Sequence, residues 1–495
     1  MGETFTDFAS LLPRLSWWAI FLVTQGLTVW AITHVLRQRK EPMTMLAWIF
    51  GILLMPIVGA VFYYMIGERR VRRRTRKIRK RMAPIIEALA SSADREEATA
   101  AALRQLQANP GLDESLRQLA ELSSKLGTVP PTAGNLVEAS LTAQETYESI
   151  LQAINGARNH VHLEYYIYRP DATGKMFLDR LTEKARQGVE VRVLIDAIGS
   201  WRTSRRFFRP LLEAGGHVAF FLPAIPWRRT WHINCRNHRK IVVVDAEVAF
   251  AGSQNIGDEY RGLLRRSGPW KDTHLRLEGP AVRELQEVFV EDWYFAAKEN
   301  LTGDRYMKRQ PARGDSLVQI VPTGPDQEPP ILSHIFFAAL ALARRSIRIS
   351  TPYFVPDPGL ILALQHAAYR GIQVDILIPA KTDSRLVLWA GRSYYQDLVR
   401  AGVRIHEFRH GMLHSKVVSI DDTWTLVGSA NMDVRSFLLN FEVTALILDE
   451  NLSRKLRKDF WCDVQNSRSV QLLEKSGPFW PTLLEGTARL LTPLL

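Results

Sequence analysis

An 18-residue pattern occurs twice in the chain and constrains its fold more than any other feature. The first copy runs from His238 to Asn255 and the second from His414 to Asn431, and both read H-x-K-x4-D-x6-G-S-x-N. The copies begin 176 residues apart, and every internal spacing is identical. Six residue types repeated at fixed offsets predict a domain duplication rather than two ordinary strands with chance polar residues.

The residue types in this motif suit the handling of a phosphate. Histidine is a nucleophile or a proton donor near neutral pH, lysine supplies positive charge, and serine and asparagine are neutral donors. Phosphoryl transfer through a covalent intermediate needs two histidines, which two facing copies supply. The candidate catalytic residues are therefore His238, Lys240, Asp245, His414, Lys416 and Asp421, and the candidate phosphate-binding residues are Ser253, Asn255, Ser429 and Asn431.

Strands and helices alternate ahead of each motif. Three apolar runs in the first half read as strands, and the runs between them read as helices; the strands are 161–168, 189–196 and 218–222. The same order recurs in 346–354, 371–378 and 401–408. This pattern predicts an α/β fold with two duplicated α/β/α halves that face each other.

Composition shifts divide the chain into four predicted parts. Residues 1–82 form a membrane hairpin with a basic run, and 83–135 form a helical connector. Residues 136–305 form the first half and 306–495 the second. The apolar tail from residue 479 is expected to pack on the core.

Two uncharged stretches near the N-terminus predict a transmembrane helical hairpin. Residues 15–36 and 43–66 are each long enough to cross a hydrocarbon core of about 30 Å. A cleaved signal peptide is the weaker alternative because a second stretch follows. A re-entrant hairpin stays open, since Pro42 and Pro56 would suit it.

The charge is concentrated beside these stretches. Of the net +13, residues 1–82 carry +10, and residues 69–81 alone hold ten Lys/Arg. This flank favours a cytoplasmic location for the rest of the chain and would attract anionic lipids. The near-neutral remainder argues against a nucleic-acid partner. The two cysteines, Cys235 and Cys462, predict neither a disulfide framework nor a metal cluster.

At the doubled motif the sequence resembles the phospholipase D superfamily, and within it the bacterial cardiolipin synthases. The blocks 252–260 and 428–442 carry the closer resemblance, together with 351–357, Ser393-Tyr394-Tyr395 and the terminal Pro493-Leu494-Leu495. The resemblance implies location in the bacterial inner membrane as a multi-pass protein, with phosphatidylglycerol and anionic membrane lipids as partners. It implies no cofactor, and it leaves homo-oligomer formation open.

The resemblance also implies a transphosphatidylation without a metal. His238 would attack phosphatidylglycerol to form a phosphatidyl-histidine, and His414 would act as general acid and base; the reverse assignment stays open. Glu442 is the expected orienting carboxylate behind His414, and Asp258 or Glu259 behind His238. Asp245 and Asp421 could instead support the strands, and sequence alone does not separate these roles.

Four other functions remain to be weighed. A hydrolase that releases phosphatidic acid would have the same site, as would a transferase that uses phosphatidylethanolamine. A membrane-anchored nuclease is disfavoured by the near-neutral catalytic region. A scaffold without activity is disfavoured because both motifs are intact.

Overall fold

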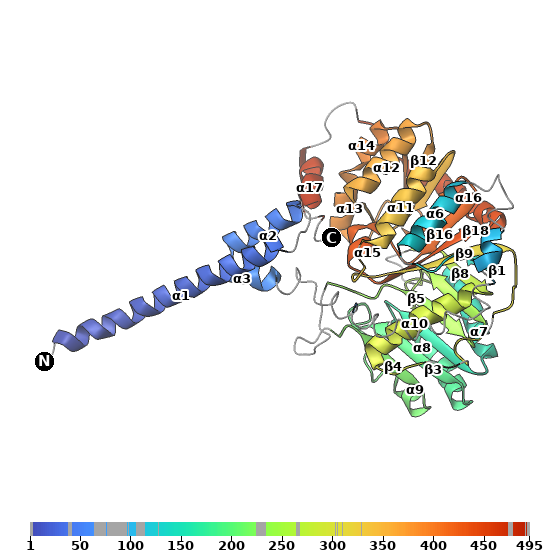
Figure 1. Cartoon of the computed structure of the whole chain (residues 1–495), viewed down its shortest axis with the longest axis horizontal. Helices are drawn as coiled ribbons and strands as arrows, with labels where there is room; N and C mark the ends of the chain where they lie inside the picture. Colours follow the sequence, from blue (N-terminus) through green and yellow to red (C-terminus); the bar gives the residue numbers. More distant parts are fainter. Residues whose placement is uncertain are drawn as a thin grey trace. The chain divides into compact units, whose positions relative to one another are not determined.

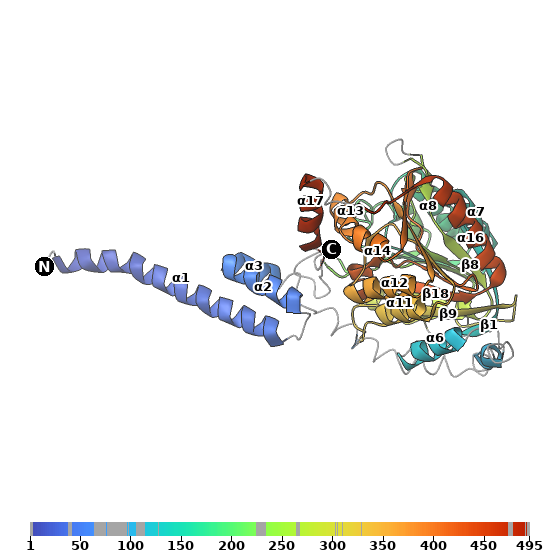
Figure 2. The ribbon, with the colours of Figure 1, turned by 90° about the horizontal axis from the view of Figure 1, so that it is seen from above.

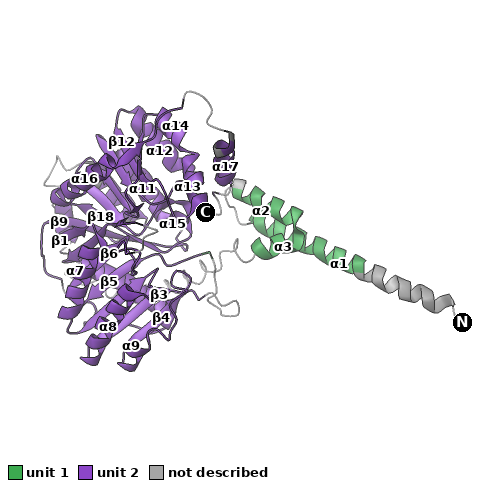
Figure 3. Ribbon diagram, turned by 180° about the vertical axis from the view of Figure 1, so that it is seen from behind, with its two compact units in different colours: residues 1–70, 232–234 green, residues 71–231, 235–495 purple. Residues whose placement is uncertain are grey.

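The structure is a computed structural model, and it divides into two compact units. One unit comprises residues 1–70 with 232–234, and the other comprises 71–231 with 235–495 (Figure 3). The described residues are 3–37, 42–63, 76, 97, 99–104, 114–126, 128–223, 234–263, 268–301, 303, 305–308, 310–327, 329–473, 479–490 and 492. The basic run 69–81, apart from residue 76, most of 83–113 and the terminal 493–495 lie outside them.

The first unit contains three apolar helices. These are α1 (Glu3–Arg37), α2 (Pro42–Leu54) and α3 (Pro56–Phe62). Proline cannot donate to the preceding turn, and Pro56 accordingly starts a new helix after Met55. Ala31 and Val35 of α1 pack with Ile52 and Ala60 in a small core.

One described helix is long and apolar enough to cross a membrane by length and composition. It covers the 21 residues Trp17–Arg37, and an 18-residue window within it has a mean hydropathy of 1.6. Most of its large apolar side chains are exposed, as on a lipid-facing helix. Because α2 and α3 have only 13 and 7 residues, a second crossing stays a prediction.

A 15-stranded mixed sheet forms the centre of the second unit (Figure 1). The strands of the first half are β1 (Thr132–Ser140), β2 (His160–Tyr165), β3 (Glu190–Asp196), β4 (His217–Phe221), β5 (Lys240–Val244), β6 (Val248–Gly252), β7 (Trp270–Lys271) and β8 (His274–Glu278). Those of the second half are β9 (Ser316–Thr323), β10 (Ser346–Ser350), β11 (Phe354–Val355), β12 (Gln373–Pro379), β13 (Arg404–Phe408), β14 (Met412–Leu413), β15 (Val417–Ile420), β16 (Trp424–Gly428), β17 (Met432–Asp433), β18 (Glu442–Leu448) and β19 (Ser467–Ser469).

Helices cover this sheet in both halves. In the first half they are α7 (Ala143–Gly156), α8 (Ala172–Arg186), α9 (Arg209–Glu213) and α10 (Ala281–Ala297). In the second half they are α11 (Ile331–Leu342), α12 (Pro358–Tyr369), α13 (Arg385–Arg392), α14 (Tyr395–Arg400), α15 (Val434–Leu438) and α16 (Glu450–Gln465), and α17 (Phe479–Leu490) packs outside them against α13. Seen from above, α6 (Glu114–Lys125) lies alongside α11, and Ser115 Oγ donates to Leu342 O at 3.3 Å (Figure 2).

The strand order shows the duplication directly. The order is β19-β13-β12-β10-β15-β16-β18-β9-β1-β8-β6-β5-β2-β3-β4. Outward from β9 and β1 each half contributes the same series, and the second half adds β19 at its edge. The other four strands form two separate two-stranded sheets, β11 with β17 and β14 with β7. In each series three strands are parallel to one another, and the motif strand is antiparallel to them. The α/β fold and the duplication are confirmed. The halves meet edge to edge at β1 and β9, and β1 begins inside the stretch 83–135 expected to be a helical connector.

The equivalent helices of the two halves begin in the same way. Asp171 Oδ1 accepts from Gly174 N at 2.9 Å at the start of α8, and Asp357 Oδ1 accepts from Leu360 N at 3.0 Å at the start of α12. Such capping satisfies N–H groups that have no partner within the helix. The repeated order of elements therefore reflects the same local signals in both halves.

The C-terminal tail differs from the prediction. Only one side of α17 is covered, where Ala488 packs with Ala390 and Val355. Elsewhere the helix exposes four large apolar side chains, which are Trp480, Leu483, Leu484 and Leu490. The expectation that the tail packs on the core therefore holds for Ala488 and not for these exposed side chains.

Candidate active site

The two motif histidines stand at the same place in their halves. Lys240, at the start of β5, pairs with Tyr165 at the end of β2, and Val417 pairs likewise with Ser350 at the end of β10. His238 and His414 come just before these strands and therefore lie at the carboxyl ends of the parallel strands. Both side chains are buried.

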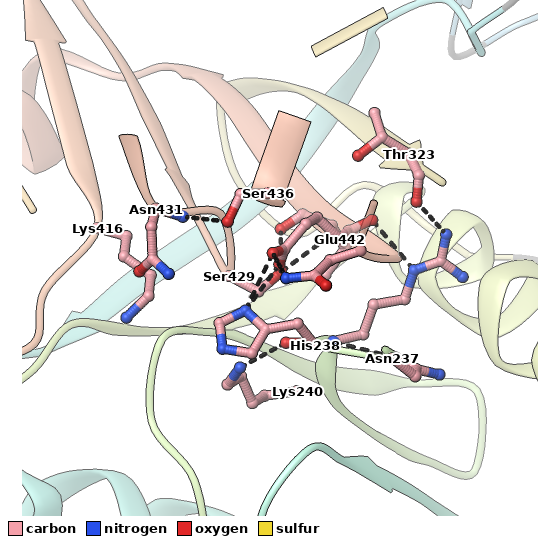
Figure 4. Close-up of polar contacts among 12 residues, drawn as sticks. Asn237, His238, Lys240, Thr323, Lys416, Ser429, Asn431, Ser436 and Glu442 are labelled. Atoms are coloured by element: carbon pink, nitrogen blue, oxygen red, sulfur yellow. Dashed lines mark hydrogen bonds and ion pairs between the residues drawn. The ribbon is translucent and has the colours of Figure 1, made fainter. Parts of the chain in front are cut away.

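His238 is held by the second half of the chain. Its Nδ1 lies 3.0 Å from Glu442 Oε2 and 3.1 Å from Oε1, at the start of β18 (Figure 4). Its backbone N donates to Phe441 O at 2.9 Å. A carboxylate on Nδ1 fixes the tautomer that carries the lone pair on Nε2. Within the described part of the chain no hydrogen bond reaches Nε2 of His238.

His414 is held in the same way by the first half. Its Nδ1 lies 2.8 Å from Asp272 Oδ2, between β7 and β8. Its backbone N donates to Lys271 O at 2.7 Å, which matches the bond from the backbone N of His238 to Phe441 O. Each histidine is thus paired with a carboxylate from the opposite half, and the site needs both halves.

These crossed pairs correct the expected orienting carboxylates. Glu442 does orient a histidine, but that histidine is His238 and not His414. Asp258 accepts from Thr173 N at 2.8 Å, and Glu259 pairs with Arg169 at 3.2 Å, so neither contacts His238. Asp258 caps the first turn of α8, and Glu259 binds the arginine just ahead of that helix.

The two lysines lie next to the histidines. Lys416 Nζ is 3.2 Å from His414 Nε2 and donates to His414 O at 2.8 Å. Lys240 Nζ donates to His238 O and lies 5.5 Å from the centre of the Tyr166 ring. Both lysines are buried, and burial lowers the pKa of Lys240 well below its ordinary value and that of Lys416 to about 8. An anion in the site favours the charged form of each lysine.

The two serines hold the carboxylates. Ser253 Oγ donates to Asp272 and accepts from Thr273 N at 3.2 Å. Ser429 Oγ donates to Glu442 and accepts from Val443 N at 3.0 Å (Figure 4). A hydroxyl has a single proton, so neither serine has a donor left for a phosphate in this arrangement. Their expected phosphate-binding role is replaced by the positioning of Asp272 and Glu442.

The two asparagines are used differently. Asn255 Oδ1 accepts from Ile167 N at 3.1 Å, and its Nδ2 donates to Tyr260 OH at 3.0 Å, so this amide joins the loops of the first half. Among the described residues, the buried Oδ1 of Asn431 has no hydrogen-bond partner. Of the four expected phosphate-binding residues, Asn431 keeps the most unused hydrogen-bonding capacity.

Asp245 and Asp421 are structural residues at the far ends of the motif strands. Asp245 accepts from three successive backbone N–H groups, those of Arg158, Asn159 and His160, at 2.7, 2.7 and 2.8 Å. Asp421 accepts from residues 344–346 at 2.9, 2.6 and 2.8 Å. Five residues of strand place each carboxylate about 17 Å from its lysine. They support the strands rather than the reacting atoms.

Burial sets the protonation states of the site. Burial lowers the pKa of His238 to about 4, against the opposing effect of Glu442, and burial together with Lys416 lowers the pKa of His414. Burial alone would raise the pKa of Glu442, but His238 and Lys240 outweigh it and lower that pKa. At neutral pH both imidazoles are therefore neutral, and Nδ1–H donates to an ionised carboxylate.

Sequence reasoning missed Asp272 and the residues that surround Asn237. Asn237 Nδ2 donates to Glu164 and, at 3.3 Å, to Asp292, which also accepts from Arg239. This buried group fixes both neighbours of His238 in the chain. The position of Asp272 just ahead of a strand, like that of Glu442, is the signal that could have revealed it.

The described residues contain no group of three or more His, Cys, Asp or Glu side chains that could hold a metal ion. The charges of the site come from the two lysines and the two carboxylates. The arrangement can attack a phosphodiester with one imidazole and exchange a proton with the other.

The duplicated fold and the two H-x-K half-sites define the class: a phospholipase D-like protein with both half-sites in one chain. The model for "Cardiolipin synthase, PLD-like domain" matches residues 150–293 and 336–464, and the model for "Phospholipase_D-nuclease N-terminal" matches residues 26–68. The chain belongs to the cardiolipin synthase family.

Named relatives cover almost the whole chain. It is 37% identical over 461 residues to a cardiolipin synthase of Alkalihalophilus pseudofirmus, covering 92% of this chain and 90% of the relative. It is 38% identical over 487 residues to a cardiolipin synthase of Geobacillus kaustophilus, covering 96% and 94%. A phosphatidylserine synthase structure from Haemophilus influenzae matches with a TM-score of 0.58 at 15% identity, over 76% of this chain and 98% of that one, which shows the fold alone.

Proposed function

We propose that the protein is a cardiolipin synthase that joins two phosphatidylglycerol molecules and releases glycerol. The crossed pairs of His238 with Glu442 and His414 with Asp272 are the observation that carries this proposal. They supply two equivalent imidazoles at one site, as a two-step transfer requires. The family supports the choice of a phospholipid as the substrate.

In the first step His238 Nε2 attacks the phosphorus of one phosphatidylglycerol. The bond from phosphorus to the glycerol oxygen breaks, and His414 donates a proton to that oxygen. The product is a phosphatidyl-histidine and free glycerol. Lys240 and Lys416 neutralise the phosphoryl oxygens as charge develops there. Without substrate, burial keeps His414 neutral. The negative charge of the bound phosphodiester favours protonation of His414, so that it can act as the acid.

In the second step His414 accepts the proton of a glycerol hydroxyl on a second phosphatidylglycerol. That oxygen attacks phosphorus, the bond to His238 breaks, and cardiolipin forms. Charge and protons are restored, so no further reactant is consumed. His238 is assigned as the nucleophile because its Nε2 is free of hydrogen bonds from the described residues, whereas Lys416 contacts that of His414.

The test uses purified full-length protein in phosphatidylglycerol nanodiscs with a chelator present. Cardiolipin, glycerol and phosphatidic acid are quantified for the wild type, His238→Ala and His414→Ala. The exposed His366 on α12 provides the control variant His366→Ala. Equal amounts of cardiolipin and glycerol, lost only in the two site variants, are expected. Phosphatidic acid as the main product would replace the proposal by a hydrolase.

A substrate with a better leaving group tests the order of the histidines. Phosphatidyl-p-nitrophenol needs no proton on its leaving oxygen, so the variant that lacks the general acid should still release p-nitrophenol in a burst. We expect the burst in His414→Ala and not in His238→Ala. A burst in His238→Ala alone would reverse the assignment.

We further propose that the protein is a multi-pass membrane protein whose catalytic unit lies in the cytoplasm, and that its parts are 1–82, 83–135, 136–305 and 306–495. The two matched segments of the family model support the two halves, and α1 supports the membrane anchor. Cys462 is exposed and Cys235 is buried, so Cys462 reports topology directly. An impermeant maleimide should label it in inside-out vesicles and not in intact spheroplasts, with Cys462→Ser as control. Labelling in spheroplasts would overturn the orientation.

A further inference from the structure

The segments that follow β3 and β12 border the catalytic histidines. Both strands are parallel to the strands that end beside the motif lysines, so whatever follows them lies at the same edge of the sheet as the site. In the first half this is a loop that leads to α9. In the second half it is α13, against which α17 packs.

The loop of the first half carries a concentrated positive charge. Residues 201–209 read W-R-T-S-R-R-F-F-R, with four arginines and no acidic residue. We call this stretch the basic segment. Trp201 is 70% exposed, and all four arginines are exposed. One of them, Arg209, pairs with Glu213 at 2.7 Å, and Arg202 lies 5.1 Å from the Trp201 ring.

The basic segment is fixed close to His238. Ser200, which precedes it, donates from Oγ to Tyr166 O at 3.0 Å, and the Tyr166 ring lies 4.9 Å from the His238 ring. Thr203 Oγ1 donates to Tyr168 O. The carboxylate of Asp196 accepts from Gly199 N at 2.9 Å on one side and from Asn237 N at 3.0 Å on the other. The segment is thus connected to the imidazole of His238 through Ser200 and Tyr166.

The helices of the second half carry an apolar surface. Arg489 of α17 lies 4.6 Å from the Tyr394 ring, and Ala488 is buried against α13. Four large apolar side chains of α17 are exposed within one arc of about 120° around the helix, next to this contact. They are Trp480 at 70% exposed, Leu483 at 48%, Leu484 at 44% and Leu490 at 77%. We call this set the apolar stripe.

We propose that the basic segment and the apolar stripe form one surface that docks the catalytic unit onto an anionic lipid bilayer. Arginines bind the phosphates of lipid headgroups, and tryptophan prefers the boundary between headgroups and acyl chains. A helix with one apolar side lies in that boundary. The identity of the lipid rests on the proposed function, but docking itself does not.

A bilayer fits this surface better than a protein or a nucleic acid does. The two elements flank the one site at which a lipid phosphate must arrive, and they join positive charge with apolar side chains that a nucleic acid would leave exposed to water. Each arginine beside an anionic membrane strengthens association about fivefold. Docking would bring the phosphodiester to His238 without a lipid having to leave the bilayer completely.

The test compares substrate in a bilayer with the same headgroup in solution. Full-length Arg202→Glu/Arg205→Glu/Arg206→Glu is assayed for glycerol release in phosphatidylglycerol nanodiscs. It is assayed again in phosphatidylcholine nanodiscs with dihexanoyl phosphatidylglycerol added as monomers. We expect the ratio of bilayer to monomer activity to fall at least about tenfold.

The matched control carries the same change in charge at the opposite edge of the first half. It is Arg158→Glu/Arg186→Glu/Arg313→Glu, whose three arginines are exposed. This control should keep the wild-type ratio. An unchanged ratio in the basic-segment variant, or an equal fall in the control, would overturn the proposal. Inactivity of the wild type on both substrates would instead refute the proposed function.

The apolar stripe has a readout that needs no activity. Trp480→Cys in a Cys462→Ser background is labelled with an environment-sensitive fluorophore and reconstituted in discs whose lipids are brominated on the acyl chains. Quenching is expected in phosphatidylglycerol discs and should weaken in the basic-segment variant. A label that is equally bright with and without bromine would exclude the stripe from the bilayer.

Discussion

Neutralising each orienting carboxylate tests the crossed pairing of the site. Glu442→Gln and Asp272→Asn keep the side-chain shape and remove the charge that faces Nδ1. At an effective dielectric constant of about 20, a full imidazolium charge 3.0 Å from the Glu442 oxygen is stabilised by about 5.5 kcal/mol, and one 2.8 Å from Asp272 by about 6 kcal/mol. Because each 1.4 kcal/mol is a factor of ten, each variant should lose about 10³ to 10⁴ in kcat on phosphatidylglycerol.

The leaving group separates the two variants. With phosphatidyl-p-nitrophenol the first step needs a nucleophile and no general acid. Asp272→Asn, which impairs the acid His414, should therefore regain most of its burst, and Glu442→Gln, which impairs the nucleophile His238, should not. Glu407→Gln is the matched control, since this buried carboxylate pairs with Arg392 at 2.8 Å outside the site.

A burst that returns in Glu442→Gln and not in Asp272→Asn would refute the crossed pairing. If each histidine were oriented from within its own half, Glu442→Gln would be the variant that regains the burst. A loss of folding would remove both activities together, and the melting temperature of the full-length protein in detergent would show it. Retention of full activity by both variants on phosphatidylglycerol would mean that the carboxylates do not tune the imidazoles at all.

Three further outcomes follow from the site. Lys416→Met should lower kcat at least about 100-fold with a smaller change in KM, because its charge meets the developing oxyanion; steady-state kinetics that show only a raised KM would contradict this. Asp421→Ala leaves three backbone N–H groups without their acceptor and should cost about 3 kcal/mol of stability, read as a lower melting temperature at unchanged kcat per folded molecule. Because burial lowers the pKa of His238 to about 4, the imidazole stays neutral as the pH falls below its ordinary value, and it becomes protonated only near pH 4. The acid limb of kcat/KM on phosphatidyl-p-nitrophenol should therefore lie well below the ordinary histidine pKa of about 6.5, and a limb at or above that value would disprove the depressed pKa.

The sequence predicted those features that depend on local spacing. The repeated motif identified His238 and His414, and the alternation of apolar runs located the starts of β2 and β3 within one residue. Both signals are local, because the residues of a strand and those that flank it are adjacent in the sequence. The duplicated α/β fold followed from the recurrence of the same order.

The pairing of carboxylates with histidines could not be read in this way. Glu442 follows His414 by 28 residues, which predicts that it orients His414, yet β18 brings it to His238. Only the packing of one half against the other decides which imidazole a carboxylate meets. The serines were misassigned for a related reason, since their partners Asp272 and Glu442 are set by strand neighbours that a linear motif does not name.

The crossed pairs also set the moment during synthesis at which the chain can first react. Helix α1 is made early, whereas His238 has no orienting carboxylate until Glu442 has left the ribosome and β18 has joined the sheet. A nascent or truncated chain therefore has a lone imidazole without its counter-charge. Both imidazoles have their orienting carboxylates only when both halves have folded. A partly synthesised chain should therefore not react with the surrounding lipids.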